Sequence, residues 1–350
     1  MRGEDLTKLI KSLNERLIPL RAHIDLTYRC NLKCIHCYQD SPAENELSTD
    51  ELLNIIDQLA QEGCLEISFT GGEPLIRGDF TKIAEYAREK GHAITVQTNG
   101  TLIDEKMAIK LKELNADAYV SLYGVTARTH ERITLIPGSF SKTMQGIKLL
   151  KRAGVKVHVS TVVMRQNVME VKDLSKMCRE MDIEFEPSPL LLPTVSGSLN
   201  PLKYKLTDEE LEGFVDQLIE EGGWESSNEG RVGLCTGGRS SLWITADGRV
   251  YPCFLFAHPI EGMGDVNLRR THLHEAWRVS PTFNSIREVK VEDFGGCLSC
   301  LYKSVCAFCP ALVLIKSPDK MAALHQVCRL AKATYQLLQG RKQGEGKNKP

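Results

Sequence analysis

Three cysteines in the N-terminal part of the chain have a spacing that suits a metal cluster. Cys30, Cys34 and Cys37 lie in the segment TYRCNLKCIHCYQD, with three and then two residues between them. Thiolates are the usual ligands of iron–sulfur clusters, and ligands this close in sequence need a loop that folds around the metal. Three thiolates can hold three irons of a four-iron cluster, which leaves the fourth iron open to a small chelating ligand.

Zinc and unliganded thiols are the alternatives for these three cysteines. Structural zinc normally takes four ligands, and a fourth is missing locally, because His36 lies awkwardly between two close ligands. Cysteine is often buried without a metal. However, chance produces this spacing in only about one in a hundred chains of this cysteine content.

A second group of seven cysteines lies in the C-terminal third of the chain. It begins with Cys235 and Cys253, the latter in DGRVYPC. It continues with Cys297-x2-Cys300-x5-Cys306-x2-Cys309 and ends with Cys328. So many clustered thiols indicate metal binding. The spacing alone leaves iron and zinc equally open, since two C-x2-C pairs are also typical of zinc ribbons.

A glycine-rich turn, FTGGEPLIRGDF, follows an apolar run at 65–69. Gly71 and Gly72 allow the backbone to approach a ligand closely, and Glu73 offers a carboxylate to a cationic group. An ordinary strand-to-helix turn would use the same residues, so this segment is informative only together with the cysteines.

Alternating strand and helix patterns surround these segments. The expected strands are 22–26, 65–69, 93–97, 118–122, 155–163 and 183–187, and the expected helices are 49–63, 80–90, 104–114, 141–153 and 168–181. Repeated βα units predict parallel strands. Six units are too few for a complete eight-stranded barrel. We therefore expect an α/β fold, a partial (β/α)6 TIM-like barrel, with its site at the carboxyl ends of the strands and with a C-terminal cysteine-rich iron–sulfur domain.

The pattern also predicts domain boundaries. We expect an N-terminal helical extension at 1–19, the partial barrel at 20–195 and a linker with a bridging helix at 196–230. The cysteine-rich domain should occupy 231–335, and a polar, disordered tail should follow at 336–350.

Composition and charge indicate the cellular compartment and the kinds of partner. The 350 residues carry a net charge of −1, so we expect no nucleic-acid partner and no membrane partner. The N-terminus lacks an apolar signal segment, which favours a cytoplasmic protein. Thiols stay reduced there, so the 12 cysteines are expected to bind metal rather than form disulfides.

The segment CNLKCIHC resembles the signature of the radical S-adenosylmethionine (SAM) superfamily, and GGEP resembles that family's second motif. The resemblance implies a [4Fe-4S] cluster whose open iron is chelated by SAM. It also implies reductive cleavage of SAM to a 5′-deoxyadenosyl radical, and contact of Gly71, Gly72 and Glu73 with the methionyl amine. Polar residues at later strand ends of such proteins contact SAM, which nominates Asn99 and Ser121. Arg132 could pair with the methionyl carboxylate, because a guanidinium suits carboxylate geometry.

The C-terminal cysteines resemble the SPASM domain, which carries two auxiliary iron–sulfur clusters. This resemblance assigns the outer cluster to Cys297, Cys300, Cys306 and Cys328, and the inner cluster to Cys235, Cys253 and Cys309. Two features depart from the family pattern. The last pair is one residue closer than usual, and only three thiolates remain for the inner cluster.

The resemblance implies an enzyme that abstracts hydrogen from its substrate, with flavodoxin or ferredoxin as reductant. Proteins of this architecture modify peptide or protein side chains, which is the function we expect first. A radical step in quinone or haem cofactor biosynthesis is the second expectation. A non-enzymatic zinc-binding scaffold is the third, and the intact GGEP motif argues against it.

Overall fold

The computed structural model describes residues 12–13, 15–40, 44–222, 235–257, 266–289, 295–311 and 318–346. Most of the expected N-terminal extension therefore lies outside the described residues. No described helix combines the length and the apolar character that crossing a membrane requires.

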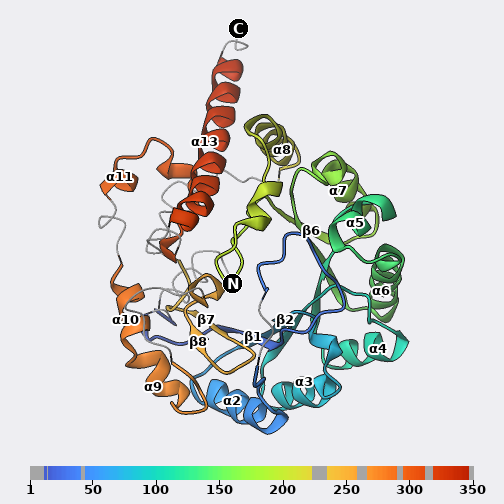
Figure 1. The fold of residues 1–350 in the computed structure, drawn as a ribbon, viewed down its shortest axis with the longest axis vertical. Coiled ribbons are helices and arrows are strands. Elements are labelled where there is room, and N and C mark those ends of the chain that lie inside the picture. The colour runs from blue at the N-terminus through green and yellow to red at the C-terminus, as the bar shows by residue number, and fades with distance from the viewer. Residues whose placement is uncertain are drawn as a thin grey trace.

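The core of the molecule is one curved sheet with strand order β6-β5-β4-β3-β2-β1-β7-β8 (Figure 1). All neighbouring strands are parallel except β7 and β8, which form an antiparallel hairpin. The strands are β1 Arg21–Thr27, β2 Glu66–Gly71, β3 Ala93–Thr98, β4 Asp117–Ser121, β5 Lys156–Val162, β6 Glu184–Ser188, β7 Ser241–Ile244 and β8 Val250–Tyr251. The six expected strands are confirmed.

Helices cover the outside of this sheet (Figure 1). Around the barrel they are α2 Thr49–Gln61, α3 Phe80–Glu89, α4 Glu105–Glu113, α5 Ala127–Thr134, α6 Ser139–Ala153 and α7 Val171–Glu180. The later helices are α8 Asp208–Glu220, α9 Leu273–Arg278, α10 Pro281–Glu288, α11 Gly295–Leu298 and α13 Pro318–Gly346. Short 3₁₀ helices are η1 Pro74–Ile76, η2 Val168–Glu170, η3 Asn200–Tyr204, η4 Phe254–Ala257 and η6 Lys303–Val305.

Strand β1 shows how the sequence pattern builds this architecture. Ala22, Ile24 and Leu26 are fully buried in the core beneath the helices. Because side chains alternate along a strand, His23 and Asp25 point to the opposite face, toward the inside of the barrel. The alternate polar positions of β1 therefore contribute polar side chains to the inside of the barrel.

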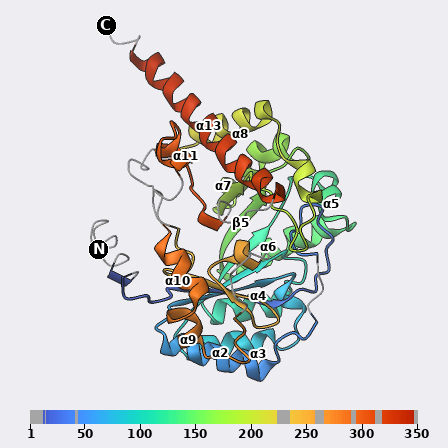
Figure 2. The same ribbon diagram turned by 60° about the vertical axis from the view of Figure 1, so that its left-hand side comes forward.

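Three features differ from the expectations. The cysteine-rich region, expected as a domain of its own at 231–335, contributes strand β7, which pairs in parallel with β1 and extends the barrel sheet. Helix α5 was not expected from its short polar sequence. Helix α13 continues through residues 336–346, where we expected a disordered tail, and it projects beyond the rest of the molecule (Figures 1 and 2).

Helix α13 packs against α8 through Leu330 and Ala333, and charged pairs lie beside this apolar contact. Arg329 Nε lies 2.6 Å from Asp208 Oδ1, and Arg341 contacts Asp216 Oδ1 at 2.7 Å. The Gln326 side chain donates to the Leu191 carbonyl at 2.7 Å and accepts from the Leu191 N–H at 3.2 Å. These contacts link the end of the cysteine-rich region to the open edge of the barrel.

Candidate active site

The loop that follows β1 carries the first three cysteines. Its backbone is pinned by the end of α5: the Lys33 N–H donates to the Thr134 carbonyl, and the Ile35 N–H donates to the Ile133 carbonyl, both at 3.0 Å. Helix α5 thus positions the loop, although its residues carry no recognisable motif.

The thiols of this loop lie close enough to influence one another. Burial, followed by the neighbouring Cys37 and Cys30 thiols, raises the pKa of Cys34 to about 12. The Leu32 N–H donates to Cys30 Sγ at 3.4 Å, and the Asn99 amide lies 3.9 Å from the same sulfur. Converging thiols that accept N–H groups are what an iron–sulfur cluster requires, so this loop fits one.

The two glycines of the GGEP segment pack directly on the chain that leads into this loop. A Cβ on Gly71 would lie 2.2 Å from the Thr27 carbonyl oxygen, and one on Gly72 would lie 2.4 Å from the Arg29 oxygen. Gly71 also has a φ of +126°, which other residues rarely adopt. The Gly72 and Glu73 N–H groups donate to Thr27 and Arg29 at 2.7 and 3.0 Å. Only glycine allows this approach.

Glu73 is fully buried and its carboxylate is held by three donors. It accepts from the Thr98 hydroxyl at 2.7 Å, the Asn99 N–H at 2.7 Å and the Leu75 N–H at 3.2 Å. Burial raises its pKa to about 7 against these hydrogen bonds. Asn99 in turn donates from its side chain to Asn31 at 2.8 Å. Glu73 and Asn99 are therefore joined to the cysteine loop.

Ser121 and Arg132, the other two residues nominated for SAM binding, are not hydrogen-bonded to Glu73 in the described part of the chain. Ser121 ends β4 beside Tyr123, whose side chain also reaches Cys34. The exposed Arg132 guanidinium donates to the Gln166 carbonyl at 2.5 Å. A SAM-binding role for Ser121 and Arg132 stays a prediction, as it does for Gly71, Gly72 and Glu73.

Neighbouring thiols influence one another in two groups among the C-terminal cysteines. Burial, and then the neighbouring Cys309 and Cys235 thiols, raises the pKa of Cys253 to about 12. Burial also raises the pKa of Cys306 to about 11, with further contributions from Cys328, Cys300 and Cys297. The Gly237 N–H donates to Cys235 Sγ at 3.4 Å. The proximity of the thiols agrees with the grouping, and the ligand roles stay predictions.

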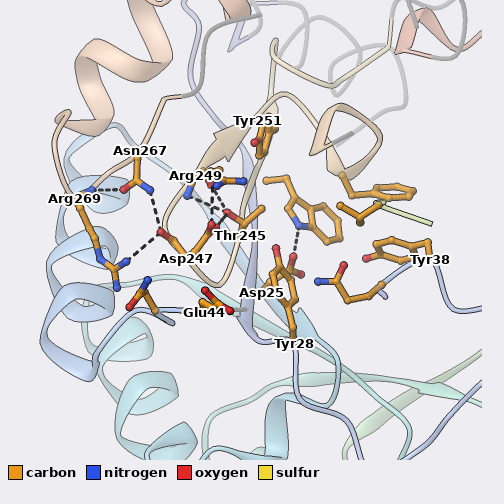
Figure 3. A pocket seen from close by; sticks show the side chains of 15 residues that line it. Asp25, Tyr28, Tyr38, Glu44, Thr245, Asp247, Arg249, Tyr251, Asn267 and Arg269 are labelled. Atoms are coloured by element: carbon orange, nitrogen blue, oxygen red, sulfur yellow. Dashed lines mark hydrogen bonds and ion pairs between the residues drawn. The ribbon is translucent and has the colours of Figure 1, made fainter. Parts of the chain in front are cut away.

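A cavity of about 540 Å³ lies between β1, the loop after Cys37 and the β7–β8 hairpin (Figure 3). One end is aromatic: the Tyr38 and Phe254 ring centroids are 5.5 Å apart, and Trp243 and Phe254 are 5.2 Å apart. The other end carries charges of both signs, with Arg249, Arg269, Asp247 and Glu44 on its wall. The cavity thus offers an apolar surface and charged groups on opposite sides.

Asp25 lies on the wall of this cavity and was missed by sequence reasoning. It is 4% exposed, and its Oδ2 accepts from the Trp243 indole N–H at 2.9 Å. Within the described part of the chain, its buried Oδ1 has no hydrogen-bond partner. Burial raises the pKa of Asp25 to about 7. The sequence does contain one indication of Asp25: it is a charged residue at an inward-facing position of a strand that is otherwise mostly apolar.

Comparisons with known proteins agree with this geometry. The model of the radical SAM superfamily matches residues 24–178, and that of the SPASM iron–sulfur cluster-binding domain matches residues 235–301. The AdoMet-dependent heme synthase of Nitratidesulfovibrio vulgaris is 30% identical over 339 residues, covering 85% of this chain and 89% of that protein. This chain belongs to the radical SAM superfamily.

Two further comparisons describe the range of this family. The mycofactocin maturase MftC of Mycolicibacterium smegmatis is 28% identical over 305 residues, covering 81% of this chain and 75% of that protein. The crystal structure of Streptococcus suis SuiB bound to its precursor peptide SuiA has the same fold, with a TM-score of 0.69 at 20% identity over 90% of this chain and 78% of that one.

As a radical SAM enzyme with a SPASM domain, the chain uses a [4Fe-4S] cluster, SAM and auxiliary iron–sulfur clusters. The cysteine loop fits the SAM-binding cluster, because its thiols converge and receive N–H donors. When bound, the cluster supplies the electron that cleaves SAM. The polypeptide itself holds the thiols and fixes the loop through Gly72 and α5.

Proposed function

We propose that this radical SAM enzyme catalyses a step of haem biosynthesis on an iron tetrapyrrole that carries carboxylate side chains. The similarity to the Nitratidesulfovibrio heme synthase carries this proposal, because it extends over 85% of this chain and 89% of that protein. The cavity supports it through its aromatic end, which suits a flat ring system.

Modification of a peptide is the second candidate. It is favoured by the similarity to the mycofactocin maturase over most of both chains. An elongated peptide could also occupy the cavity, so the geometry alone does not separate the two candidates. A small electron-transfer protein such as flavodoxin or ferredoxin would supply the electron in either case.

Release of 5′-deoxyadenosine distinguishes these functions. Anaerobically reconstituted enzyme with SAM and reduced flavodoxin should release 5′-deoxyadenosine faster with iron coproporphyrin than without it, and haem should form, as detected by mass and absorbance. A panel of cysteine-containing peptides serves as the comparison. Stimulation by a peptide, without any by the tetrapyrrole, would transfer the assignment to peptide modification.

A further inference from the structure

We propose that His158, Glu184 and Glu186 form a binding site for a divalent transition-metal ion such as Zn²⁺ or Mn²⁺, separate from the cysteines. His158 belongs to β5, and the two glutamates belong to β6. One ligand atom from each of the three side chains lies within 4.8 Å of the other two. The site is independent of the reaction proposed above.

The register of β5 and β6 brings these side chains to one face of the sheet. His158 lies directly opposite Glu184, and Ser160 lies opposite Glu186, so Glu186 is diagonal to the imidazole on the same face. Both neighbours of His158 along β5 are buried in the core on the other face. Because β6 is the last strand of the described sheet, an ion held here would fasten this edge strand to β5.

His158 is the residue that points to a metal ion. Its side chain is 3% exposed, and the Tyr119 ring stacks on it with the ring centroids 4.1 Å apart. Among the described residues, neither ring nitrogen has a hydrogen-bond partner. Glu184 Oε2 nevertheless lies 2.8 Å from Nδ1, and Glu186 Oε1 lies 3.6 Å from it. The nearer contact therefore has the length of a hydrogen bond without its direction, whereas buried polar groups normally find a partner.

The arrangement around Nδ1 suits ligands that point at a shared ion rather than at one another. Metal–nitrogen and metal–oxygen distances of zinc sites, with tetrahedral angles, place neighbouring ligand atoms about 3.4 Å apart. The two distances from Nδ1 lie on either side of this value. On the other side of the ring, Asp117 Oδ2 lies 3.9 Å from Nε2. A carboxylate commonly orients a metal-binding imidazole from this position.

The charges around the imidazole also leave room for a cation. Lys156 Nζ pairs with Glu184 at 3.3 Å, but it contacts Oε1, whereas Oε2 faces the ring. This pairing therefore does not compete with metal binding. Arg21, whose charge also acts on Tyr119, is paired with Glu66 at 2.7 Å. An imidazole among carboxylates favours zinc or manganese over calcium and magnesium, which take oxygen ligands.

Mn²⁺ is the probe that tests this site, because it prefers oxygen and nitrogen ligands to thiolates. Its free ion gives a six-line electron paramagnetic resonance spectrum that is lost on binding. Reconstituted holoenzyme with oxidised clusters is treated with EDTA, desalted and titrated with MnCl₂. The wild type should bind about one ion per chain, and spin-echo spectra of the bound ion should show modulation from a ring nitrogen.

Two variants remove the expected ligands. His158→Gln and the double variant Glu184→Gln/Glu186→Gln should each raise the dissociation constant for Mn²⁺ at least about tenfold. The double variant changes only exposed side chains. Asp173→Asn/Glu180→Gln is the matched control, because it removes two exposed carboxylates from α7, and it should bind Mn²⁺ as the wild type does.

A free-ion signal that wild-type protein leaves unchanged at millimolar Mn²⁺ would overturn the inference. So would a bound ion without nitrogen modulation, since the acidic surface alone would then attract it. That measurement is made on the wild type and does not depend on the folding of His158→Gln. Equal affinity of the wild type and the double variant, or an equal loss of affinity in the control, would also overturn the inference.

Discussion

Glu73 is an unusual carboxylate because its position in the motif suggests SAM, while all of its visible contacts are internal. Its Oε1 accepts from Thr98 and Leu75, and its Oε2 accepts from the Asn99 N–H. These contacts position Asn99 beside Cys30. Binding of the SAM ammonium group by Glu73 would be an additional role, which a charge-removing substitution tests.

Glu73→Gln should weaken SAM binding about tenfold while the cluster remains intact. Glutamine keeps the shape but removes the charge, and its amide would face the Asn99 N–H, which leaves a buried donor without an acceptor. SAM affinity is measured by equilibrium dialysis, and iron content is measured on the same samples. Glu105→Gln, on the first turn of α4, is the control. SAM affinity equal to that of the wild type would remove Glu73 from the SAM site.

Asp25 should make the stability of the protein depend on pH. Burial raises its pKa from 3.8 to about 7, so the folded state favours the protonated form. Ionisation then costs stability: the cost is absent below about pH 4, grows as the pH rises and is complete above about pH 7, where it reaches at most about 4 kcal/mol.

Asp25→Asn removes this cost and keeps an acceptor for Trp243. We expect the thermal midpoint of the variant, relative to wild type, to increase between pH 5 and pH 8. Asp50→Asn, at an exposed position of α2, controls for the loss of a charge. A constant difference between Asp25→Asn and wild type over this range would show that Asp25 does not ionise within it.

At the scale of elements, the turn between β2 and η1 determines where the cysteine loop begins. Gly72→Ala would place a methyl group 2.4 Å from the Arg29 carbonyl and 2.7 Å from the Tyr28 carbonyl. These are backbone atoms, so the chain immediately before Cys30 must move. We expect the variant to lose up to four irons per chain and to melt several degrees lower.

Gly78→Ala is the matched control in the same segment, because nothing lies within 4 Å of the added methyl group. It should keep the iron content and the thermal midpoint of the wild type. If Gly72→Ala also keeps them, the close packing of the turn on the cysteine loop is not what holds that loop in place.

The elements that could be predicted from sequence are those with a repeating local pattern. The six barrel strands and the helices between them alternate in a way that is visible within short windows. Helix α2 illustrates this: Ser48 and Glu51 form a capping box, and the apolar positions Leu52, Ile55, Ile56 and Leu59 share its buried face.

The elements that were missed depend on distant partners. Trp243 pairs with Asp25 across 218 positions of sequence, and no local pattern shows that β7 will lie beside β1. Helix α5 is short and polar, and it is stabilised by the cysteine loop that it pins. The cysteines were predictable because metal ligation depends on residue type and spacing, whereas Asp25 becomes visible only once the cavity exists.

At the scale of the whole molecule, the three sets of cysteines predict three clusters. If each is a four-iron cluster, anaerobically reconstituted protein should contain about twelve irons per chain. Replacing Cys30, Cys34 and Cys37 together with alanine should leave about eight. The measurement is iron and sulfide per chain. A wild-type content near four would contradict the assignment of the C-terminal cysteines.

The pairing of β7 with β1 limits how such enzymes can be recombined. The register that sets Ala22 opposite Leu242 and Ile24 opposite Ile244 makes the C-terminal region part of the sheet rather than an exchangeable cassette. A chimera joined after α8 would have to bring a strand of matching register and an indole that reaches Asp25. Without them β1 would become an open sheet edge, prone to pairing with another chain. Grafting substrate preference from one relative to another should therefore succeed only when β1 and the hairpin are transplanted together.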